Sequence, residues 1–343
     1  MNIFPYSTKF NLLLVTVTTV FTAGLNLPTQ GQQAGSIEMK IHPDRWSEWY
    51  RPADQPVFTK EYGNNHDAVI FREPGHPYPY QMIVSHETSG AQLWRAQSFS
   101  WSSSDWELVS AEYNIGGHYE YDDGVKVNDT YYLFEQGIVY TYRGDLADGD
   151  GNWQRAGTYP QDQCDDIGVY YENGLFHIFG EYGRFPHGPD GTSLSHFTSS
   201  TGLGDWKLVD TKAVDPNPDG SATYGVGDPT IAKIEGTYYL FCDRESEDTP
   251  YRVTGWRTDD LTSRFEYLGE VITPRSNQVD DWDNHRIQDA DILYVPELSR
   301  YVMVCNMKDI DGNPGGDFES NHLGEGETRV VGFFYSGAVI EIR

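Results

Sequence analysis

The sequence predicts an all-β protein, a five-bladed β-propeller, and two observations support this. Extended segments rich in aromatic and β-branched residues dominate the chain, and no long stretch has the 3.6-residue period of a helix. One pattern, an aspartate followed by a strand, a tight turn and a second strand, recurs five times. Four-stranded units of this size, repeated five times with little helix, are typical of a β-propeller.

The repeat is clearest in the units that begin at Asp166 and Asp228. In both, ten positions separate the aspartate from the first aromatic residue of the second strand, and Asp291 repeats this spacing. Asp123 begins a shorter copy and Asp67 a longer one. The five aspartates follow one another at intervals of 56, 43, 62 and 63 residues. Asp165 and Asp289 lie one or two positions from members of this set, so the register of the repeat stays open by that amount.

Further segments of the sequence predict the outer strands of the blades and the strand that closes the ring. A Trp or Phe in a polar context marks four outer strands, at Trp106, Trp153, Trp206 and Phe265. A closing strand over residues 329–335 should complete the last blade or pair with the first, because a propeller must hide its sheet edges.

The charge of the chain excludes two classes of partner. The 343 residues include 52 acidic and 24 basic ones, giving a formal net charge of −28. Nucleic-acid phosphates and anionic membranes would repel such a surface, so neither is expected as a partner. Aromatic residues make up 14% of the chain, which argues for packed cores and against disorder. We expect a monomer.

The N-terminus predicts export. An apolar stretch diluted by Thr covers residues 11–21 and is too short to span a membrane. We therefore interpret residues 1–34 as a signal peptide and spacer, and residues 35–343 as a single propeller domain of a secreted or periplasmic protein. A cytosolic tail is the alternative.

The three cysteines predict no metal or redox motif. Cys164, Cys242 and Cys305 are far apart and form no C-x-x-C pair. All three sit in or beside apolar strand segments, so we expect buried free thiols.

The repeated aspartate predicts the location of the active site. The first strand of each propeller blade lines the central axis, so an aspartate at its start lies at one mouth of the channel. Like charges close together raise some pKa values and leave a mixture of protonated and ionised carboxyls. Cleavage of a glycosidic bond needs that mixture, one acid and one base. For any single aspartate, capping a strand or turn is the competing interpretation.

The motifs resemble those of the five-bladed glycoside hydrolases of family 43 and its relatives in families 32 and 62. By this resemblance Asp67, in the segment 65–70, is the catalytic base, and Asp166 modulates the pKa of the acid. Asp228, in the segment 227–240, matches the general acid. The match spans about residues 60–310. It implies an inverting enzyme acting on pentose-containing glycans, as a β-xylosidase or α-L-arabinofuranosidase.

The acid position departs from the family pattern. The family has Glu there, whereas this chain has Asp228, whose carboxyl is one methylene shorter. Glu181 and Glu245 follow inner strands and could reach the mouth instead. A propeller that only binds carbohydrate, or a polysaccharide lyase, is the alternative function.

Substrate binding should involve aromatic platforms and charged groups. The candidates are His66, Glu181, Arg244, Trp282 and His285, with Trp94, Trp101 and Tyr182 as further platforms. Arg244 or Arg286 could hold an aspartate ionised, or form a surface ion pair. No cofactor is required. The family resemblance implies a calcium or sodium ion in the axial channel, with His285 as its neighbour.

Overall fold

The computed structural model describes the strands of the propeller and most of their turns. The described residues are 49–51, 58, 65–86, 90–116, 121–149, 151–183, 192–220, 224–246, 249–274, 286–310 and 327–336. The chain divides into two compact units, Met1–Ile37 and Glu38–Arg343, and every described residue belongs to the second.

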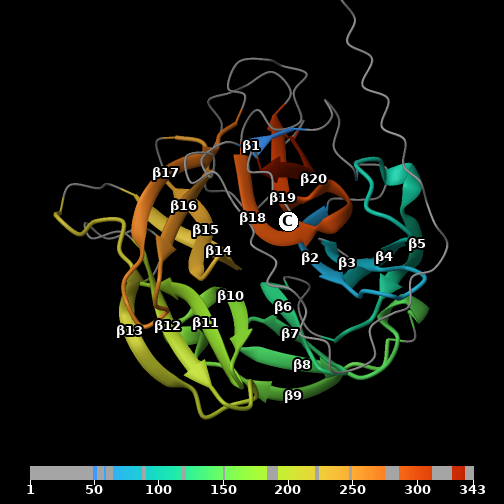
Figure 1. Cartoon of the computed structure of the whole chain (residues 1–343), viewed down its shortest axis with the longest axis horizontal. Coiled ribbons are helices and arrows are strands. Elements are labelled where there is room, and N and C mark those ends of the chain that lie inside the picture. Colours follow the sequence, from blue (N-terminus) through green and yellow to red (C-terminus); the bar gives the residue numbers. More distant parts are fainter. Residues whose placement is uncertain are drawn as a thin grey trace, which may run out of the picture. The chain divides into compact units, whose positions relative to one another are not determined.

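Residues of the second unit form five four-stranded antiparallel sheets arranged around an axis (Figure 1). Blade 1 contains β2 (Asn65–Arg72), β3 (Tyr80–His86), β4 (Gly90–Ala96) and β5 (Glu107–Tyr113). Blade 2 contains β6 (Asp123–Val127), β7 (Thr130–Glu135), β8 (Ile138–Tyr142) and β9 (Gln154–Thr158). Blade 3 contains β10 (Asp165–Glu172), β11 (Leu175–Tyr182), β12 (Ser193–Ser199) and β13 (Lys207–Val214). Blade 4 contains β14 (Gly225–Ile234), β15 (Thr237–Glu245), β16 (Arg252–Thr258) and β17 (Glu266–Ile272).

Blade 5 is closed by the N-terminal side of the domain. Its strands are β18 (Arg286–Val295), β19 (Arg300–Ile310), β20 (Glu327–Ser336) and β1 (Trp49–Tyr50). They pair in the order β18, β19, β20, β1, so the first strand of the domain is the outermost strand of the last blade. The predicted closing strand is thus confirmed and belongs to blade 5, whereas β1 was not predicted.

The predicted all-β five-bladed propeller is confirmed. The four outer strands marked by Trp or Phe are β5, β9, β13 and β17. Helical segments in the described residues are single 3₁₀ turns: η3 (Ser103–Asp105), η4 (Leu146–Asp148), η5 (Gln161–Gln163) and η6 (Pro296–Leu298). Within the described part of the chain no helix is long and apolar enough to cross a membrane.

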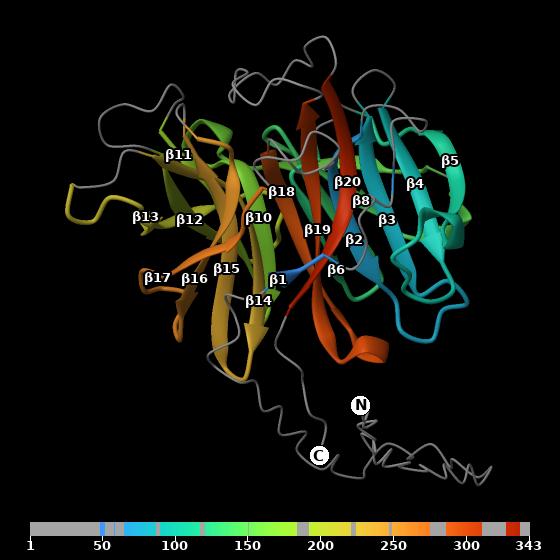
Figure 2. The same ribbon diagram turned by 90° about the horizontal axis from the view of Figure 1, so that it is seen from above.

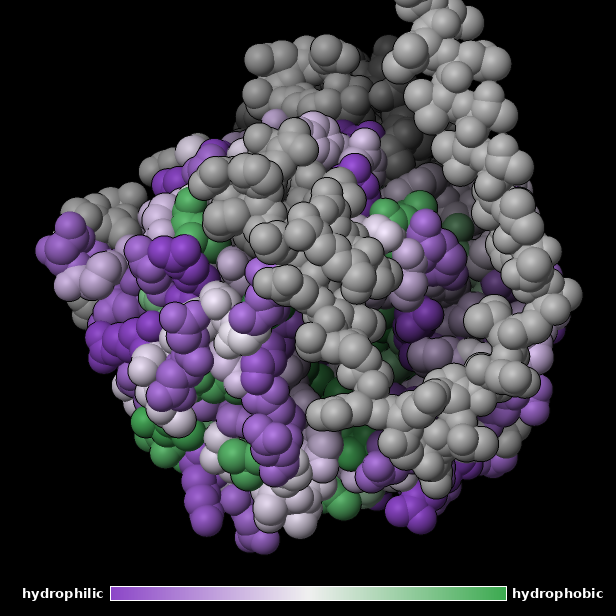
Figure 3. All heavy atoms as spheres, viewed as in Figure 1, coloured by the Kyte–Doolittle hydropathy of each residue, from purple (hydrophilic) through white to green (hydrophobic). Residues whose placement is uncertain are grey.

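The hydrophobic core is divided into five clusters, and each fills the space between two neighbouring blades. Phe241 of blade 4 packs with Met303 of blade 5, for example, and Phe71 of blade 1 packs with Tyr131 of blade 2. The three cysteines are buried free thiols in these clusters, as predicted. The face in Figure 3 is largely polar where it is described.

Inner strands contact one another around the axis, β2 with β6, β6 with β10, β10 with β14, β14 with β18 and β18 with β2. The inner strands run along the axis of the ring when the domain is seen from the side (Figure 2). Polar side chains join neighbouring inner strands at one level. Val169 N donates to Asp123 Oδ2 over 2.7 Å, Ile70 N to Asp291 Oδ2 over 2.8 Å and Ile292 N to Thr230 Oγ1 over 3.1 Å.

A second set of contacts joins the blades at the opposite, hairpin end of the inner strands. The first tyrosine of a second strand donates its hydroxyl to a glutamate of the preceding blade in three places. These are Tyr131 to Glu73 (2.8 Å), Tyr238 to Glu172 (2.5 Å) and Tyr80 to Glu297 (2.6 Å). Lys126 and Lys233 bind the first two of these glutamates as well. These three glutamate carboxylates at the hairpin end therefore all have hydrogen-bond donors from a neighbouring blade.

Close approach of the inner strands requires a glycine in blade 3. A Cβ on Gly168 would lie 1.9 Å from the carbonyl oxygen of Pro229 in blade 4. We expect Gly168→Ala to lower the free energy of unfolding by about 1–3 kcal/mol or more, because overpacking against backbone cannot be relieved by a rotamer change. Urea unfolding followed by tryptophan fluorescence measures the effect.

Gly204→Ala is the matched control, because no atom lies within 4 Å of a Cβ at that position. Equal stability of the two variants would contradict the packing of β10 against β14.

Candidate active site

Four of the five inner strands begin with a β-bulge, and these bulges build the site. The strand pairing skips two residues between Asn65 and Ala68, between Asp165 and Gly168, between Gly227 and Thr230 and between Gln288 and Asp291. In blades 3, 4 and 5 the first skipped residue is an aspartate in the left-handed backbone region. Its φ is 39° at Asp166, 45° at Asp228 and 49° at Asp289. Such strain in a non-glycine residue is concentrated at functional sites.

The bulges change the predicted register of the repeat. In blade 5 the residue equivalent to Asp166 and Asp228 is Asp289, and Asp291 occupies the position of Gly168 and Thr230. Asp123 pairs with Phe134 and is equivalent to Asp291. Asp123 and Asp291 thus form the hydrogen bonds between inner strands described above, which agrees with their interpretation as structural groups.

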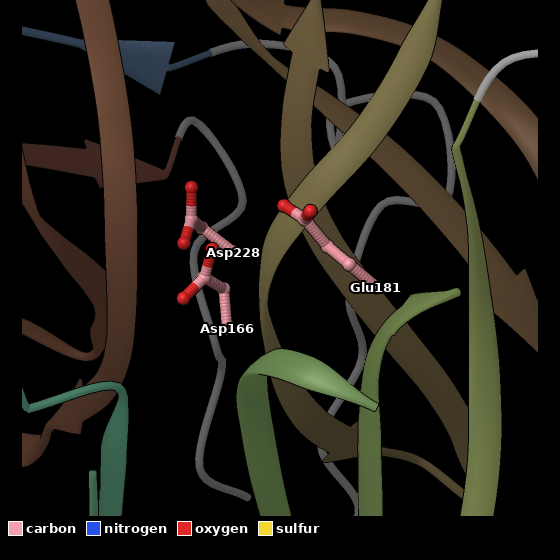
Figure 4. Close-up of side chains that lie close together, drawn as sticks. All are labelled: Asp166, Glu181 and Asp228. Atoms are coloured by element: carbon pink, nitrogen blue, oxygen red, sulfur yellow. The ribbon is translucent and has the colours of Figure 1, made fainter. Parts of the chain in front are cut away.

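Asp166 and Asp228 lie together at the mouth, as predicted, and Glu181 joins them from β11 (Figure 4). One carboxylate oxygen of each lies within 4.8 Å of the others. Glu181 pairs with Asp165 across blade 3, so its side chain belongs to the same level of the axis. We call Asp166, Glu181 and Asp228 the acid cluster.

More carboxyl groups surround the acid cluster and interact with it electrostatically. The mouth carboxylates are Asp122, Asp165, Asp166, Glu181, Asp228, Asp243, Glu245 and Asp289. Burial, and then Glu245 and the aspartates, raise the pKa of Glu181 well above its usual range. Burial, and then Asp289 and Asp243, do the same for the pKa of Asp228. The raised pKa values favour the protonated form of these carboxyls.

Asp122, one of the mouth carboxylates, has a raised pKa and is held by a hydrogen bond from the core. Burial, and then Asp166, raise the pKa of Asp122, and the hydroxyl of Tyr159 donates a short hydrogen bond to Asp122 Oδ2. Tyr159 is itself buried in the cluster between blades 2 and 3. The carboxyl is therefore fixed from the core side and faces Asp166.

Asp228, Asp243 and Asp289 form a second group whose carboxylate oxygens lie within 4.8 Å of one another. Asp243 is fully buried. Within the described residues its carboxylate has no hydrogen-bond partner other than the carboxyl of Asp228. Asp289 is oriented by amide groups, since Gln288 Nε2 and Asn306 Nδ2 donate to it over 2.7 and 2.8 Å. Carboxylate oxygens so arranged suit a hard divalent cation such as Ca²⁺.

Asp67, the predicted base, lies in the bulge of blade 1 at the same level of the axis. It belongs to neither three-carboxylate group of the described residues. His66 occupies the neighbouring bulge position, the one that holds an aspartate in blades 3, 4 and 5, and its side chain lies outside the described residues. The roles of Asp67 and His66 stay predictions.

The two arginines have different surroundings. Arg244 binds Glu270 through Nη1 over 2.6 Å and stacks on Tyr224 with 4.0 Å to the ring centroid. It alternates along β15 with Asp243 and Glu245, so it faces away from the mouth and forms the ion pair that the sequence left as an alternative. Arg286 is buried, stacks on Tyr251 and counteracts the raised pKa of Asp243.

Tyr182 is exposed, but side chains alternate along a strand, so it lies on the opposite face of β11 from Glu181 and its role as a platform stays a prediction. It follows Glu181 directly and its exposed fraction is 39%. Trp94 is buried in the core against Phe58, so the prediction that it forms a platform was wrong. Trp282 and His285 lie outside the described residues, and the ion contact predicted for His285 stays a prediction.

Sequence comparisons identify no relative: no family model and no curated protein matches the chain. Solved structures match it in fold. A thermostable family 43 glycoside hydrolase has 15% identity and a TM-score of 0.51, and the match covers 80% of this chain and 91% of that one.

The catalytic domain of a family 62 α-L-arabinofuranosidase from Coprinopsis cinerea has 13% identity and a TM-score of 0.58. The match covers 85% of this chain and 98% of that domain. This chain has the propeller fold of families 43 and 62. The same fold also carries another activity. An N-acetylgalactosamine deacetylase from F. plautii, solved with blood group B trisaccharide, has 12% identity and a TM-score of 0.54, with 85% and 95% covered.

Below the mouth, Asp123 and Asp291 interact across the ring of inner strands. Burial, and then Asp291, raise the pKa of Asp123, and burial raises the pKa of Asp291 to about 7. A carboxyl whose pKa is raised by folding binds its proton more tightly in the folded state. Its contribution to stability is present below the unfolded pKa of about 4 and is lost as the pH rises toward 7.

We therefore expect Asp291→Asn to flatten the fall in the free energy of unfolding between pH 4 and 7. The gain at pH 7 should be at most about 4 kcal/mol, at about 1.4 kcal/mol for each pH unit. The amide oxygen can still accept the hydrogen bond from Ile70 N. Urea unfolding at a series of pH values gives the measurement.

The exposed Asp129→Asn provides the comparison and should leave the pH dependence unchanged. A variant at 291 with the slope of the wild-type protein would argue against a protonated Asp291.

Proposed function

We propose that this chain is an exported inverting glycoside hydrolase that acts on pentose-containing or related oligo- and polysaccharides. The acid cluster carries the proposal, because Asp166, Glu181 and Asp228 converge at the mouth with pKa values raised for Glu181 and Asp228. A carboxyl that is protonated at neutral pH can donate a proton to a leaving oxygen. We propose a secreted or periplasmic location on the N-terminal leader, and a monomer.

Distances between the carboxyl groups restrict which residues can act together as general acid and general base. An inverting enzyme needs about 6.5–9.5 Å between its acid and its base, so that a water molecule fits between them. Oxygens of the acid cluster lie within 4.8 Å of one another, which is too close for that pair. The cluster therefore supplies the acid alone, for which the sequence predicts Asp228, and the base must come from another part of the mouth.

Asp67 is the residue proposed as base. It lies in the bulge of blade 1, whereas the acid cluster belongs to blades 3 and 4. In the reaction, the acid protonates the glycosidic oxygen while the bond between this oxygen and the anomeric carbon breaks. Water attacks the anomeric carbon from the opposite face and gives its proton to Asp67. Asp166 orients the sugar and sustains the raised pKa of the acid.

The fold supports a sugar substrate, since both hydrolases described above act on glycosides by their names and one is an α-L-arabinofuranosidase. Together with the motif resemblance this favours β-xylosidase or α-L-arabinofuranosidase activity. A panel of aryl glycosides and plant or algal glycans, followed by product analysis, identifies the sugar.

Neutral substitution of the base gives the direct test. We expect Asp67→Asn to lower kcat/KM on the best panel substrate by about 10²–10⁴-fold, because water then loses its proton acceptor. The KM and the affinity for the product sugar should stay within a few-fold. Initial rates and calorimetric titration with the sugar measure the two quantities.

Asp129→Asn, on an exposed turn, should keep wild-type turnover. A wild-type protein that binds sugar but hydrolyses none of the panel would instead be a carbohydrate-binding propeller. Unsaturated uronate products would identify a lyase.

The group Asp228, Asp243 and Asp289 favours a second candidate function, metal-assisted removal of an acetyl group from an amino sugar. The supporting observation is the buried Asp243, whose carboxylate has no hydrogen-bond partner other than Asp228 within the described residues. A bound divalent cation would satisfy it and would polarise a carbonyl group. A deacetylase with the same fold makes an amino sugar a reasonable substrate. Under the leading proposal the same ion would have a structural role.

Calcium addition and removal test this ion. We expect Ca²⁺ at about 100 times its dissociation constant to stabilise the wild-type protein by about 2.7 kcal/mol, and EDTA to reverse the effect. Asp243→Asn should abolish the response, because the buried ligand is lost. Differential scanning fluorimetry with and without Ca²⁺ shows the shift.

Asp129→Asn should respond to Ca²⁺ as the wild-type protein does. A wild-type melting temperature that neither Ca²⁺ nor EDTA changes would contradict the ion site. Glycoside hydrolysis that survives EDTA supports the leading function, and EDTA-sensitive release of acetate supports the second.

A further inference from the structure

Gly227 of β14 has no side chain, and the carboxyl of Glu181 from the neighbouring blade occupies the space where one would lie. A Cβ on Gly227 would lie 2.1 Å from Glu181 Oε1 and 3.1 Å from the Cδ atoms of Glu181 and of Glu245. Two carboxyl groups, one from β11 of blade 3 and one from β15 of blade 4, therefore meet over a bare backbone position. Any other residue at 227 would displace Glu181.

Exposure distinguishes these two glutamates. Glu245 is buried, with an exposed fraction of 7%, whereas Glu181 is partly exposed and is followed by the exposed Tyr182. Glu181 is thus the member of the pair that faces a substrate at the mouth, and Glu245 lies behind it. Of all charges around Glu181, that of Glu245 contributes most to its raised pKa, after burial. A proton on Glu181 relieves the repulsion between the two groups.

The surroundings of Asp228 differ from those of Glu181. Asp228 belongs to both three-carboxylate groups, and the charges that affect it most are those of Asp289 and Asp243 on the blade 5 side. Its side chain is one methylene shorter and starts from a left-handed backbone position. The carboxyl of Asp228 is therefore shared with the blade 5 side of the mouth, whereas that of Glu181 belongs to the acid cluster alone.

We infer that Glu181, seated over Gly227, is the proton donor of the site, with Glu245 as its positioning residue, and that Asp228 is not. This inference rests on the proposed hydrolase function. The proton of the Glu181 carboxyl moves to the glycosidic oxygen, which keeps the electron pair of the broken bond. Water supplies the new oxygen at the anomeric carbon and its proton goes to Asp67. Solvent then returns a proton to Glu181 and removes the one on Asp67, so one water molecule is consumed.

A leaving-group comparison tests this assignment. For the sugar identified by the panel, kcat/KM is measured on a 2,4-dinitrophenyl glycoside, which needs little protonation, and on the phenyl glycoside, which needs it strongly. We expect Glu181→Gln to lose about 10²–10⁴-fold on the phenyl glycoside and little on the dinitrophenyl one. The alkaline limb of its pH–rate profile should disappear. Asp228→Asn should keep that limb and lose similar factors on both substrates.

Gly227→Ala provides a variant that leaves both glutamates intact. Its Cβ displaces Glu181, so it should show the leaving-group dependence of Glu181→Gln, whereas Gly204→Ala should behave as the wild-type protein. Should Glu181→Gln fail to fold, Glu181→Asp keeps a carboxyl and should retain the alkaline limb at reduced kcat.

Three outcomes would overturn the inference. One is a Glu181→Gln variant, or a Gly227→Ala variant, that loses equal factors on both glycosides. Another is the acid signature in Asp228→Asn. A Glu181→Asp variant without the alkaline limb would also contradict it. A wild-type protein without turnover on any glycoside overturns the proposed function itself and this assignment with it, and it differs from the other outcomes because no variant is needed to see it.

Discussion

Closure of the ring of inner strands is the constraint on which the rest of the structure depends. Five strands must approach one another around one axis, and each blade meets this requirement with the residue at one equivalent position: Ala68, Asp123, Gly168, Thr230 and Asp291. Asp123, Thr230 and Asp291 bond the next inner strand, and Gly168 lets its backbone approach. Asp123 is buried and Asp291 is partly buried, so each carboxyl must be hydrogen-bonded or protonated. The ring thereby fixes the height at which the bulges open toward the mouth.

The two ends of the ring differ in how their polar groups are satisfied. At the hairpin end, Glu73 and Glu172 each bind a lysine and a tyrosine, and burial of these acids is compensated. At the mouth, eight carboxyl groups interact, and Arg286 is the cation that acts on Asp243. Positive φ angles at Asp166, Asp228 and Asp289 add backbone strain at this same end. Stabilising contacts and functional groups are therefore separated along the axis, as expected when a site must store unfavourable charge.

Much of the fold could be predicted from the sequence because its repeat has a physical cause. Each blade needs an inner hairpin, so the aromatic strands and the tight turn between them recur and reveal five units. The bulges could not be predicted, because no residue pattern in the inner strands marks the one extra residue that each bulge inserts. This is why Asp291 was taken as the equivalent of Asp228, whereas Asp289 holds that place. Trp94 was misassigned for a related reason, since an aromatic residue at a strand gives the same signal in a core as at a surface.

The sequence predicted an acidic site around Asp166 and Asp228, which the structure brings together with Glu181. It could not rank these acids as proton donors, because the side chain beside Gly227 comes from another blade. A motif in one strand names the residue in that strand, so the segment 227–240 directed attention to Asp228. The space beside Gly227 is filled from blade 3, by a residue 46 positions earlier in the chain. Contacts of this kind depend on how closely two inner strands approach, which the ring closure sets and no local pattern records. In a propeller built from weakly similar blades, a glycine beside an acidic motif is therefore informative: it indicates that a neighbouring blade supplies the side chain at that point of the mouth.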